Sequence, residues 1–325
     1  MPMEHILSNN RKQSPMNEFP FQPHEVVPFR DQEAIERVRR IRREDITRHA
    51  NPDFRIHVVR DSEIGLITLI DRFYRLKTAM DEGREVAFIL GNPNPGYVSF
   101  ARMINRFQLN CSGLWVFAMD EWADEAGNIA PESYERGFRH ALLKYFYYEI
   151  DENLRPPVSQ FLSPNNQNIG DYSRMLADRG GADACYSGSG WAGHIAFIDP
   201  RTPQWSRDLE EFKRQGARVV DLHPLTVAQN SLHSSFGFSG DVASVPPKAA
   251  TIGPADVLGA KYRMDVNSLS TMGTFSSWQR LITRLVAHGP VTPDIPASIL
   301  QTVPTDFYIA ESAAADIETH WYKGY

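Results

Sequence analysis

The amino-acid sequence predicts an α/β protein built around a mostly parallel sheet with helices on both faces. Segments such as EVAFIL (85–90) and LWVFAM (114–119) are apolar throughout, which is typical of strands buried on both sides. Segments with the spacing of amphipathic helices lie between them, and this alternation indicates β-α-β units. A chain of 325 residues is long enough to bury a large core in one main domain.

The first residues of the chain predict where the α/β domain begins. Residues 1–30 hold five prolines and no periodic apolar pattern, so we expect an N-terminal arm there and the α/β domain over 31–325. Apolar residues recur among the arginines of 31–48, which predicts a solvated helix with one buried stripe or, alternatively, a contact surface for another subunit. Pro131 suits the first position of a helix over 131–150.

The remaining elements are predicted from the same two patterns, the spacing of amphipathic helices and the apolar runs of buried strands. Helices are predicted over 31–48, 62–81, 97–109, 131–150, 167–178, 225–233, 274–288 and 311–318. Strands are predicted over 54–59, 85–90, 114–119, 182–186, 217–222, 248–252, 261–266 and 305–310.

Composition narrows the class of protein. The net charge of −6 gives no reason to expect nucleic-acid binding, which usually requires a basic face. The sequence has no apolar run of membrane-spanning length and no signal-peptide core, so we expect a cytoplasmic protein with no membrane partner. Two cysteines are too few for a disulfide framework, and their spacing resembles no zinc site.

Ligands of parallel sheets bind at the carboxyl ends of the strands, and three such ends carry unusual residues. The first is LGNPNPGYVSF (90–100), where Gly91, Asn92, Asn94 and Gly96 are candidates for binding an anionic or hydroxylated ligand. A plain strand-to-helix turn is the alternative, because the segment fits neither the P-loop nor the dinucleotide-binding pattern.

The second strand end is FAMDEWADEAGN (117–128), which places the carboxylates of Asp120 and Glu121 directly after a buried strand. Asp124 and Glu125 follow closely. Such residues are often solvated, but four of them within six residues favour a general base. A metal site is less favoured, because no histidine stands beside them at ligand spacing.

The third is YSGSGWAGHIAFIDP (186–200), with His194 inside a glycine turn and Asp199 five residues later. Glycines allow close backbone approach to a ligand. A carboxylate is the usual group that orients a catalytic histidine, whereas a lone histidine at a strand end is more often structural.

These motifs together resemble a known family. MDEW, PESY and GSGWAGHIAFIDP are similar to the signatures of the glucosamine-6-phosphate deaminase (isomerase) family, which is related to 6-phosphogluconolactonase. VPPKAATIGPADVLGA extends the likeness, which covers about residues 60–318. The resemblance implies a Rossmann-like fold and an aldose–ketose isomerisation coupled to loss of an amine, with neither metal nor organic cofactor. The IAF and PESY forms favour the deaminase branch.

The resemblance also implies roles. Asp120 would move the proton at C2, with Glu121 beside it, and His194 would assist ring opening with Asp199 as its partner. Asp199 is one methylene shorter than the family's glutamate at this position. Further residues are implied to contact the sugar: Gly91, Asn92, Asn94, Gly96, Gly190, Trp191, Gly193 and Thr226.

Several residues depart from the family pattern. Ala192 stands where an aspartate is expected, and Pro95 lies in the phosphate loop without a backbone N–H to donate. Thr226 and Ser276 stand where a basic residue and a lysine are expected. The sequence therefore predicts an altered phosphate site. Arg280 and Arg284 are candidate replacements for the basic residues, but arginines on such a helix more often point to solvent, which is the favoured alternative.

Three functions remain open from the sequence. The favoured one is a sugar isomerase/deaminase-like enzyme of amino-sugar metabolism, acting on a small-molecule sugar or sugar phosphate and forming a homo-oligomer. The second is a lactonase-like hydrolase, which Ala192 disfavours. The third is a sugar-binding or regulatory protein that has kept the fold and lost turnover.

Overall fold

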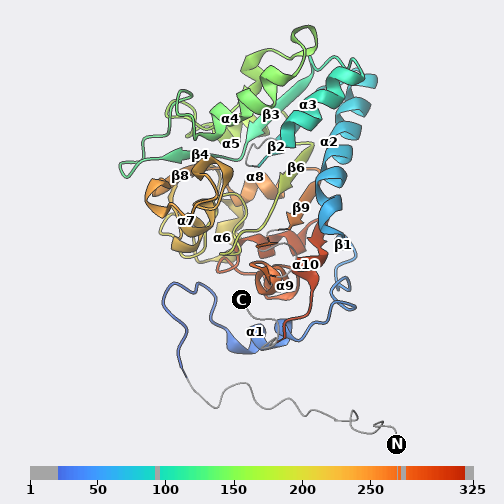
Figure 1. The fold of residues 1–325 in the computed structure, drawn as a ribbon. Helices are drawn as coiled ribbons and strands as arrows, with labels where there is room; N and C mark the ends of the chain where they lie inside the picture. Colours follow the sequence, from blue (N-terminus) through green and yellow to red (C-terminus); the bar gives the residue numbers. More distant parts are fainter. Residues whose placement is uncertain (1–20, 92–95, 269, 272–275, 319–325) are drawn as a thin grey trace, which may run out of the picture.

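Seven parallel strands form the main sheet of the protein (Figure 1). The structure is a computed structural model that describes residues 21–91, 96–268, 270–271 and 276–318. In spatial order the strands are β1 (Phe54–Val59), β12 (Thr305–Ala310), β9 (Arg263–Asn267), β6 (Ala184–Ser187), β2 (Val86–Leu90), β3 (Leu114–Ala118) and β5 (Phe161–Leu162). Each neighbouring pair is parallel. The predicted fold class is confirmed.

Both faces of the sheet are buried, which explains why its strands are apolar throughout. In β2, Val86, Phe88 and Leu90 enter one core, and Ala87 and Ile89 enter the other. The first core packs mainly under three helices: α2 (Ile64–Asp81), α3 (Gly96–Arg106) and α4 (Phe138–Tyr145). The second lies under α1 (Gln32–Arg39), α5 (Tyr172–Ala177), α6 (Leu209–Arg214), α8 (Pro254–Leu258), α9 (Arg280–His288) and α10 (Glu311–Ala314).

A second, antiparallel sheet lies beside the first. It consists of β4 (Asp120–Ala123), β8 (Lys248–Thr251) and β7 (Arg218–Asp221). The helix α7 (Pro224–Asn230) lies between β7 and β8 in the chain. The strands predicted over 217–222 and 248–252 therefore exist but do not join the parallel sheet. Asp120, which the sequence places directly after a buried strand, is itself the first residue of β4 and pairs with Thr251. This pairing fixes the backbone on which the Asp120 carboxylate stands.

The helix predicted over 131–150 is wrong in its first half. Residues 132–137 form turns, and α4 begins at Phe138 because the buried Glu121 carboxylate accepts hydrogen bonds from the backbone N–H groups of Phe138 and Arg139. Glu121 thus stabilises the N-terminus of α4, a position that favours negative charge.

The helix predicted over 31–48 ends at Arg39. Beyond it, backbone groups bind other parts of the fold: Arg284 donates to the carbonyl of Ile41, and Asp316 accepts from the N–H of Arg43. These contacts replace helical hydrogen bonds and let Ile46 reach the core. Phe29, in the predicted arm, is also buried in this core, whereas residues 1–20 lie outside the described residues.

Short elements complete the chain. A two-stranded ladder joins β10 (Ser270–Thr271) to β11 (Ser276–Ser277), so α9 begins only at Arg280. Single 3₁₀ turns occur at η1 (Asp61–Glu63), η2 (Tyr147–Glu149), η3 (Glu152–Leu154), η4 (Val158–Gln160), η5 (Ser234–Phe236) and η6 (Val242–Ser244), and a longer one at η7 (Pro296–Thr302). No helix among the described residues is long and apolar enough to cross a membrane.

Candidate active site

A cavity of about 270 Å³ lies at the carboxyl ends of four adjacent strands. We call it the carboxyl-end cavity. Its walls include Gly91 after β2, Asp120 after β3, residues 186–189 at the end of β6 and Val266 in β9. This is the edge at which parallel sheets bind ligands, and the volume suits a small molecule. Asp120 and His194, the two residues predicted to do the chemistry, both line it.

Asp120 is almost fully buried and makes no ion pair with a lysine or arginine among the described residues, although the nearby His194 acts to lower its pKa. Its Oδ1 accepts the backbone N–H of Phe197 at 3.1 Å, and the Thr251 hydroxyl hydrogen-bonds the same carboxylate. Burial raises the pKa of Asp120 to about 7, because the two neutral donors only partly replace the water lost by the charged form. A carboxyl group that titrates near neutrality is suited to proton transfer.

His194 is held by a carboxylate on one side of its ring. Its Nδ1 lies 2.7 Å from Asp199 Oδ1 and 2.9 Å from Thr226 Oγ1. The Thr226 hydroxyl donates to the same Asp199 oxygen, and the other Asp199 oxygen accepts the backbone N–H of His223. This network fixes the ring orientation, and among the described residues Nε2 makes no hydrogen bond. Asp199 therefore reaches the histidine despite its shorter side chain.

The glycine turn makes room for this histidine. A Cβ at Gly190 would overlap His194 Nε2 and the side chain of Gln229, which accepts the backbone N–H of Trp191 at 2.8 Å. Gly193 has φ +74°, a conformation that favours glycine. Neither glycine nor Trp191 lines the carboxyl-end cavity, and Trp191 instead stacks on Trp278. The absence of a side chain at Gly190 therefore leaves room for the His194 ring.

Two other predicted site residues have different positions from those expected. Glu121 is buried away from the cavity, where its carboxylate accepts three backbone N–H groups, from Trp122, Phe138 and Arg139. Desolvation raises its pKa, and these hydrogen bonds oppose the rise. Thr226, expected at the sugar, is fully buried behind His194. Both side chains are used in positioning other groups and leave no polar atom facing the cavity.

The structure describes only some of the residues predicted in the phosphate loop. Gly91 lines the cavity and Gly96 begins α3, whereas Asn92 and Asn94 lie outside the described residues. Arg284, a candidate replacement for the missing basic residues, is fully buried and donates to main-chain carbonyls, including those of Ile41 and Ala314. Arg280 donates to the carbonyl of Ser312. Neither arginine lines the cavity.

Sequence reasoning missed one charged residue of this cavity. Arg72, on α2, lies in its wall between the rings of Tyr97 and Tyr186. Nothing in the local sequence distinguishes it from the other charged residues of that helix. Only the packing of α2 against the sheet selects it.

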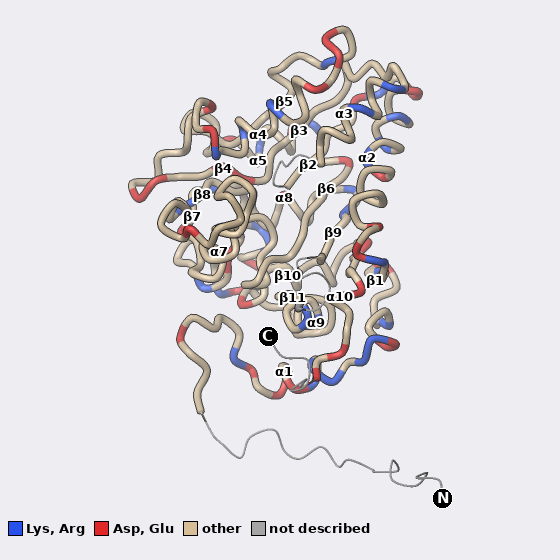
Figure 2. The backbone as a smooth tube through the Cα atoms, viewed as in Figure 1, with Lys and Arg blue, Asp and Glu red and all other residues tan. Residues whose placement is uncertain are grey.

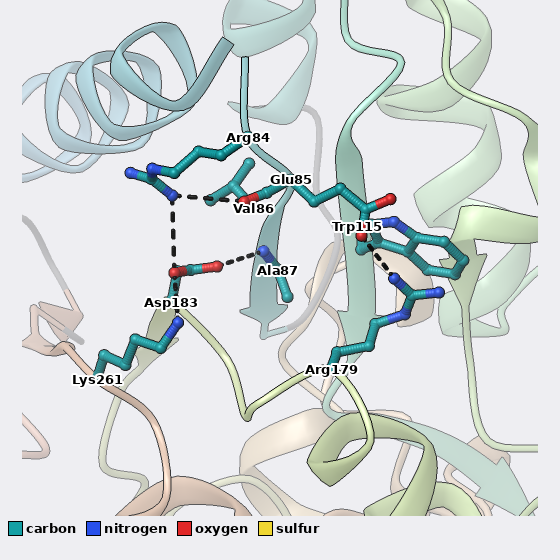
Figure 3. Close-up of a pocket in the computed structure, with 8 residues that line it drawn as sticks. All are labelled: Arg84, Glu85, Val86, Ala87, Trp115, Arg179, Asp183 and Lys261. Carbon is teal, nitrogen blue, oxygen red and sulfur yellow. Dashed lines mark hydrogen bonds and ion pairs between the residues drawn. The ribbon is translucent and has the colours of Figure 1, made fainter. Parts of the chain in front are cut away.

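A second pocket of similar volume lies at the amino ends of the strands (Figure 3). We call it the amino-end pocket; its lining residues are Arg84, Glu85, Val86, Ala87, Trp115, Arg179, Asp183 and Lys261. Its charges pair with one another: Lys261 with Asp183 at 3.0 Å and Arg179 with Glu85 at 2.9 Å. It lacks a histidine, and its pairing indicates a structural role. In the described part of the chain no cluster of three or more acidic, histidine or cysteine side chains could hold a metal.

The fold is similar to those of several solved structures. The structure resembles a monomeric glucosamine-6-phosphate deaminase with a TM-score of 0.64 and 20% identity, over 80% of this chain and 98% of that one. It also resembles 6-phosphogluconolactonase from Leishmania guyanensis, with a TM-score of 0.56 and 12% identity over 81% of this chain and 98% of that one. The protein therefore has the α/β fold that these deaminases and lactonases share.

The relatives reported from the sequence comparison are named as deaminases, whereas the fold comparison found both deaminases and lactonases. Glucosamine-6-phosphate deaminase of Rhodopirellula baltica is 29% identical over 228 residues, which is 70% of this chain and 81% of the relative. Glucosamine-6-phosphate deaminase 2 of Giardia intestinalis is 28% identical, over 69% of this chain and 77% of the relative. No family model matches the chain. The resemblance seen in the motifs is confirmed, and the chain is a divergent relative of the glucosamine-6-phosphate deaminases.

Proposed function

We propose that the protein is a sugar isomerase/deaminase-like enzyme that acts on an amino sugar in the carboxyl-end cavity. The observation that carries the proposal is the placement of two complementary groups in one cavity. Asp120 is a buried carboxyl group with a pKa of about 7, and His194 has one ring nitrogen held by Asp199 and the other without a described partner. Its sequence relatives are named as deaminases.

Each of the two groups has one role in the reaction. His194 protonates the ring oxygen as the sugar opens, and Asp120 removes the proton from C2 and returns it to C1. For a 2-amino sugar the C1 carbonyl oxygen also gains a proton and the C2 amino group loses one, so the tautomerisation leaves a hydroxyl at C1 and an imine at C2. Water then hydrolyses this imine to a ketose and ammonia. For a sugar with a hydroxyl at C2 the same transfer ends in isomerisation. Each general acid or base contributes roughly a 10²–10⁴-fold acceleration.

The burial of Asp120 suits this role. A carboxylate in water is a weak base, whereas desolvation raises its affinity for a proton and brings its pKa near the operating pH. Asp199 and Thr226 act through His194, because they hold the ring without lining the cavity. They are positioning residues.

The test measures ammonia release from glucosamine and glucosamine 6-phosphate by the full chain, alongside His194→Gln and a lactone-hydrolysis assay. Ammonia release that falls with His194→Gln, more for ring-closed sugars than for open-chain analogues, supports the proposal. Lactone hydrolysis without ammonia release would favour a lactonase-like hydrolase. Sugar binding without either activity would favour a binding or regulatory protein.

The altered phosphate site leads to a second expectation. Two basic partners are missing at Thr226 and Ser276, and each charge-assisted hydrogen bond contributes about 1.5–3 kcal/mol. We therefore expect weak turnover of glucosamine 6-phosphate and a preference for a sugar that lacks this phosphate or carries its anionic group elsewhere. An ordinary kcat/KM for glucosamine 6-phosphate, about 10⁴ M⁻¹s⁻¹ or more, would contradict this expectation.

A further inference from the structure

Arg72 is the only lysine or arginine among the described residues that line the carboxyl-end cavity. It belongs to α2, along which acidic and basic residues are interspersed (Figure 2). Its guanidinium carbon lies 4.8 Å from the ring centroid of Tyr97 and 4.8 Å from that of Tyr186. A guanidinium held between two aromatic rings is restrained in orientation, and the rings stabilise its charge.

The two tyrosines are themselves fixed. The Tyr186 hydroxyl donates to Asp71 Oδ2 at 2.7 Å, and the Tyr97 hydroxyl donates to the carbonyl of Gly91 at 3.2 Å. Their rings therefore present stable faces to the arginine. Because both tyrosines also line the cavity, the guanidinium lies at the cavity wall.

Arg72 has no ion-pair partner among the described residues. The neighbouring acidic residue, Asp71, is engaged by Arg75 at 2.9 Å and by Tyr186. The Arg72 Nε is buried and makes no hydrogen bond to the described part of the chain. A buried donor of a charged group that lacks a partner is costly, and a ligand oxygen would remove that cost.

We propose that Arg72 binds an anionic group carried by the sugar ligand. This inference rests on the proposed function, because it assumes a sugar in the carboxyl-end cavity. The guanidinium fork can bind a carboxylate or phosphate through two parallel hydrogen bonds. Arg72 thus supplies a positive charge at this cavity where the positions of Thr226 and Ser276 supply none. Of the two preferences expected above, this inference selects the sugar whose anionic group lies elsewhere, within reach of Arg72, over a sugar without an anionic group.

The experiment compares binding of three probes to the full chain by calorimetry: glucosamine 6-phosphate, glucuronate and glucose. The wild type should bind at least one anionic sugar about tenfold to hundredfold more tightly than glucose, the range expected for charge-assisted hydrogen bonds. Arg72→Gln should remove this preference while changing glucose binding by less than about twofold. Which anionic sugar loses affinity tells phosphate from carboxylate.

Two further variants keep the test decisive. Arg72→Met retains an unbranched stem between the tyrosines, so it replaces Arg72→Gln if that variant misfolds. Arg84→Gln makes the same charge change in the amino-end pocket and should leave every affinity unchanged. The proposal is overturned if the wild type shows no preference for an anionic sugar, or if the Arg72 variants retain it.

The outcome is separate from that of the enzyme proposal. A protein that prefers anionic sugars through Arg72 but releases no ammonia would refute the enzymatic function alone. A protein that releases ammonia but whose binding preference ignores Arg72 would refute this inference alone.

Discussion

The carboxyl-end cavity and the amino-end pocket differ in how their charges are partnered. In the amino-end pocket Asp183 faces Lys261 at 3.0 Å and Arg84 at 3.8 Å, and it also accepts the N–H of Ala87 (Figure 3). In the carboxyl-end cavity Asp120 has only neutral donors, and Arg72 has no carboxylate among the described residues. Charges that satisfy one another stabilise the fold, whereas charges left facing a cavity are available to a ligand.

The comparison is tested most strongly by removing one carboxylate from each pocket. Asp120→Asn should lower kcat for the amino sugar by about 10²–10⁴-fold, because the amide cannot accept the C2 proton. Asp183→Asn should leave kcat unchanged. Both variants are measured at saturating sugar, with binding checked by calorimetry. Full turnover by Asp120→Asn would mean that the base is another residue.

Ionisation of Asp120 should lower the free energy of unfolding. Its pKa is raised in the fold to about 7, so the folded protein retains a proton that the unfolded chain releases near pH 4. Stability from this group is fully present below pH 4 and is lost as pH rises through 7.

Asp120→Asn should therefore raise the free energy of unfolding at pH 8, by up to about 4 kcal/mol, and have little effect at pH 4. Denaturant unfolding at both pH values measures the difference. Asp183→Asn instead removes the ion pair with Lys261 at 3.0 Å, so it should not stabilise the protein at either pH. Equal stability of wild type and Asp120→Asn at pH 8 would show that the carboxylate is better solvated than its burial indicates.

Thr226 offers an intermediate test, because it lies behind the cavity. Thr226→Val keeps the shape but removes the hydroxyl that donates to Asp199 Oδ1 at 2.7 Å. We expect kcat to fall about tenfold, as for loss of one hydrogen bond to a charged group, with KM little changed. Thr226→Ser should restore kcat. If Thr226 had only a structural role, Thr226→Val would lower the free energy of unfolding. The fall in kcat would then be no larger for ring-closed sugars than for open-chain ones.

The sequence predicted the main sheet because its strands are apolar on both faces, as Val86–Leu90 illustrates. It also predicted the pairing of His194 with Asp199, since both stand in one short segment. It did not predict strand β4 or the late start of α4. Both depend on residues distant in sequence: Thr251 pairs with Asp120, and Glu121 binds the N–H groups of α4.

Arg72 could not be found from the sequence for a similar reason. The helix α2 carries Arg72 and Arg75 three residues apart, and the pattern treats them alike. The fold gives Arg75 an ion pair with Asp71 and places Arg72 in the cavity wall. Arg284 is a different case. From the sequence it is either a candidate for the phosphate site or a solvent-facing residue, and in the structure it is buried and donates to main-chain carbonyls.

The smallest effect is expected in the amino-end pocket. Arg84 pairs with Glu82 at 2.7 Å and with Asp183 at 3.8 Å, but 46% of its side chain is exposed. Exposed pairs contribute about 0–1 kcal/mol and are screened by salt. Arg84→Gln should therefore lower the free energy of unfolding by less than about 1 kcal/mol, and the loss should shrink in 1 M salt. Sugar binding and turnover should not change. A change in sugar affinity would show that this pocket also senses the ligand, and the division between paired and available charges would then fail.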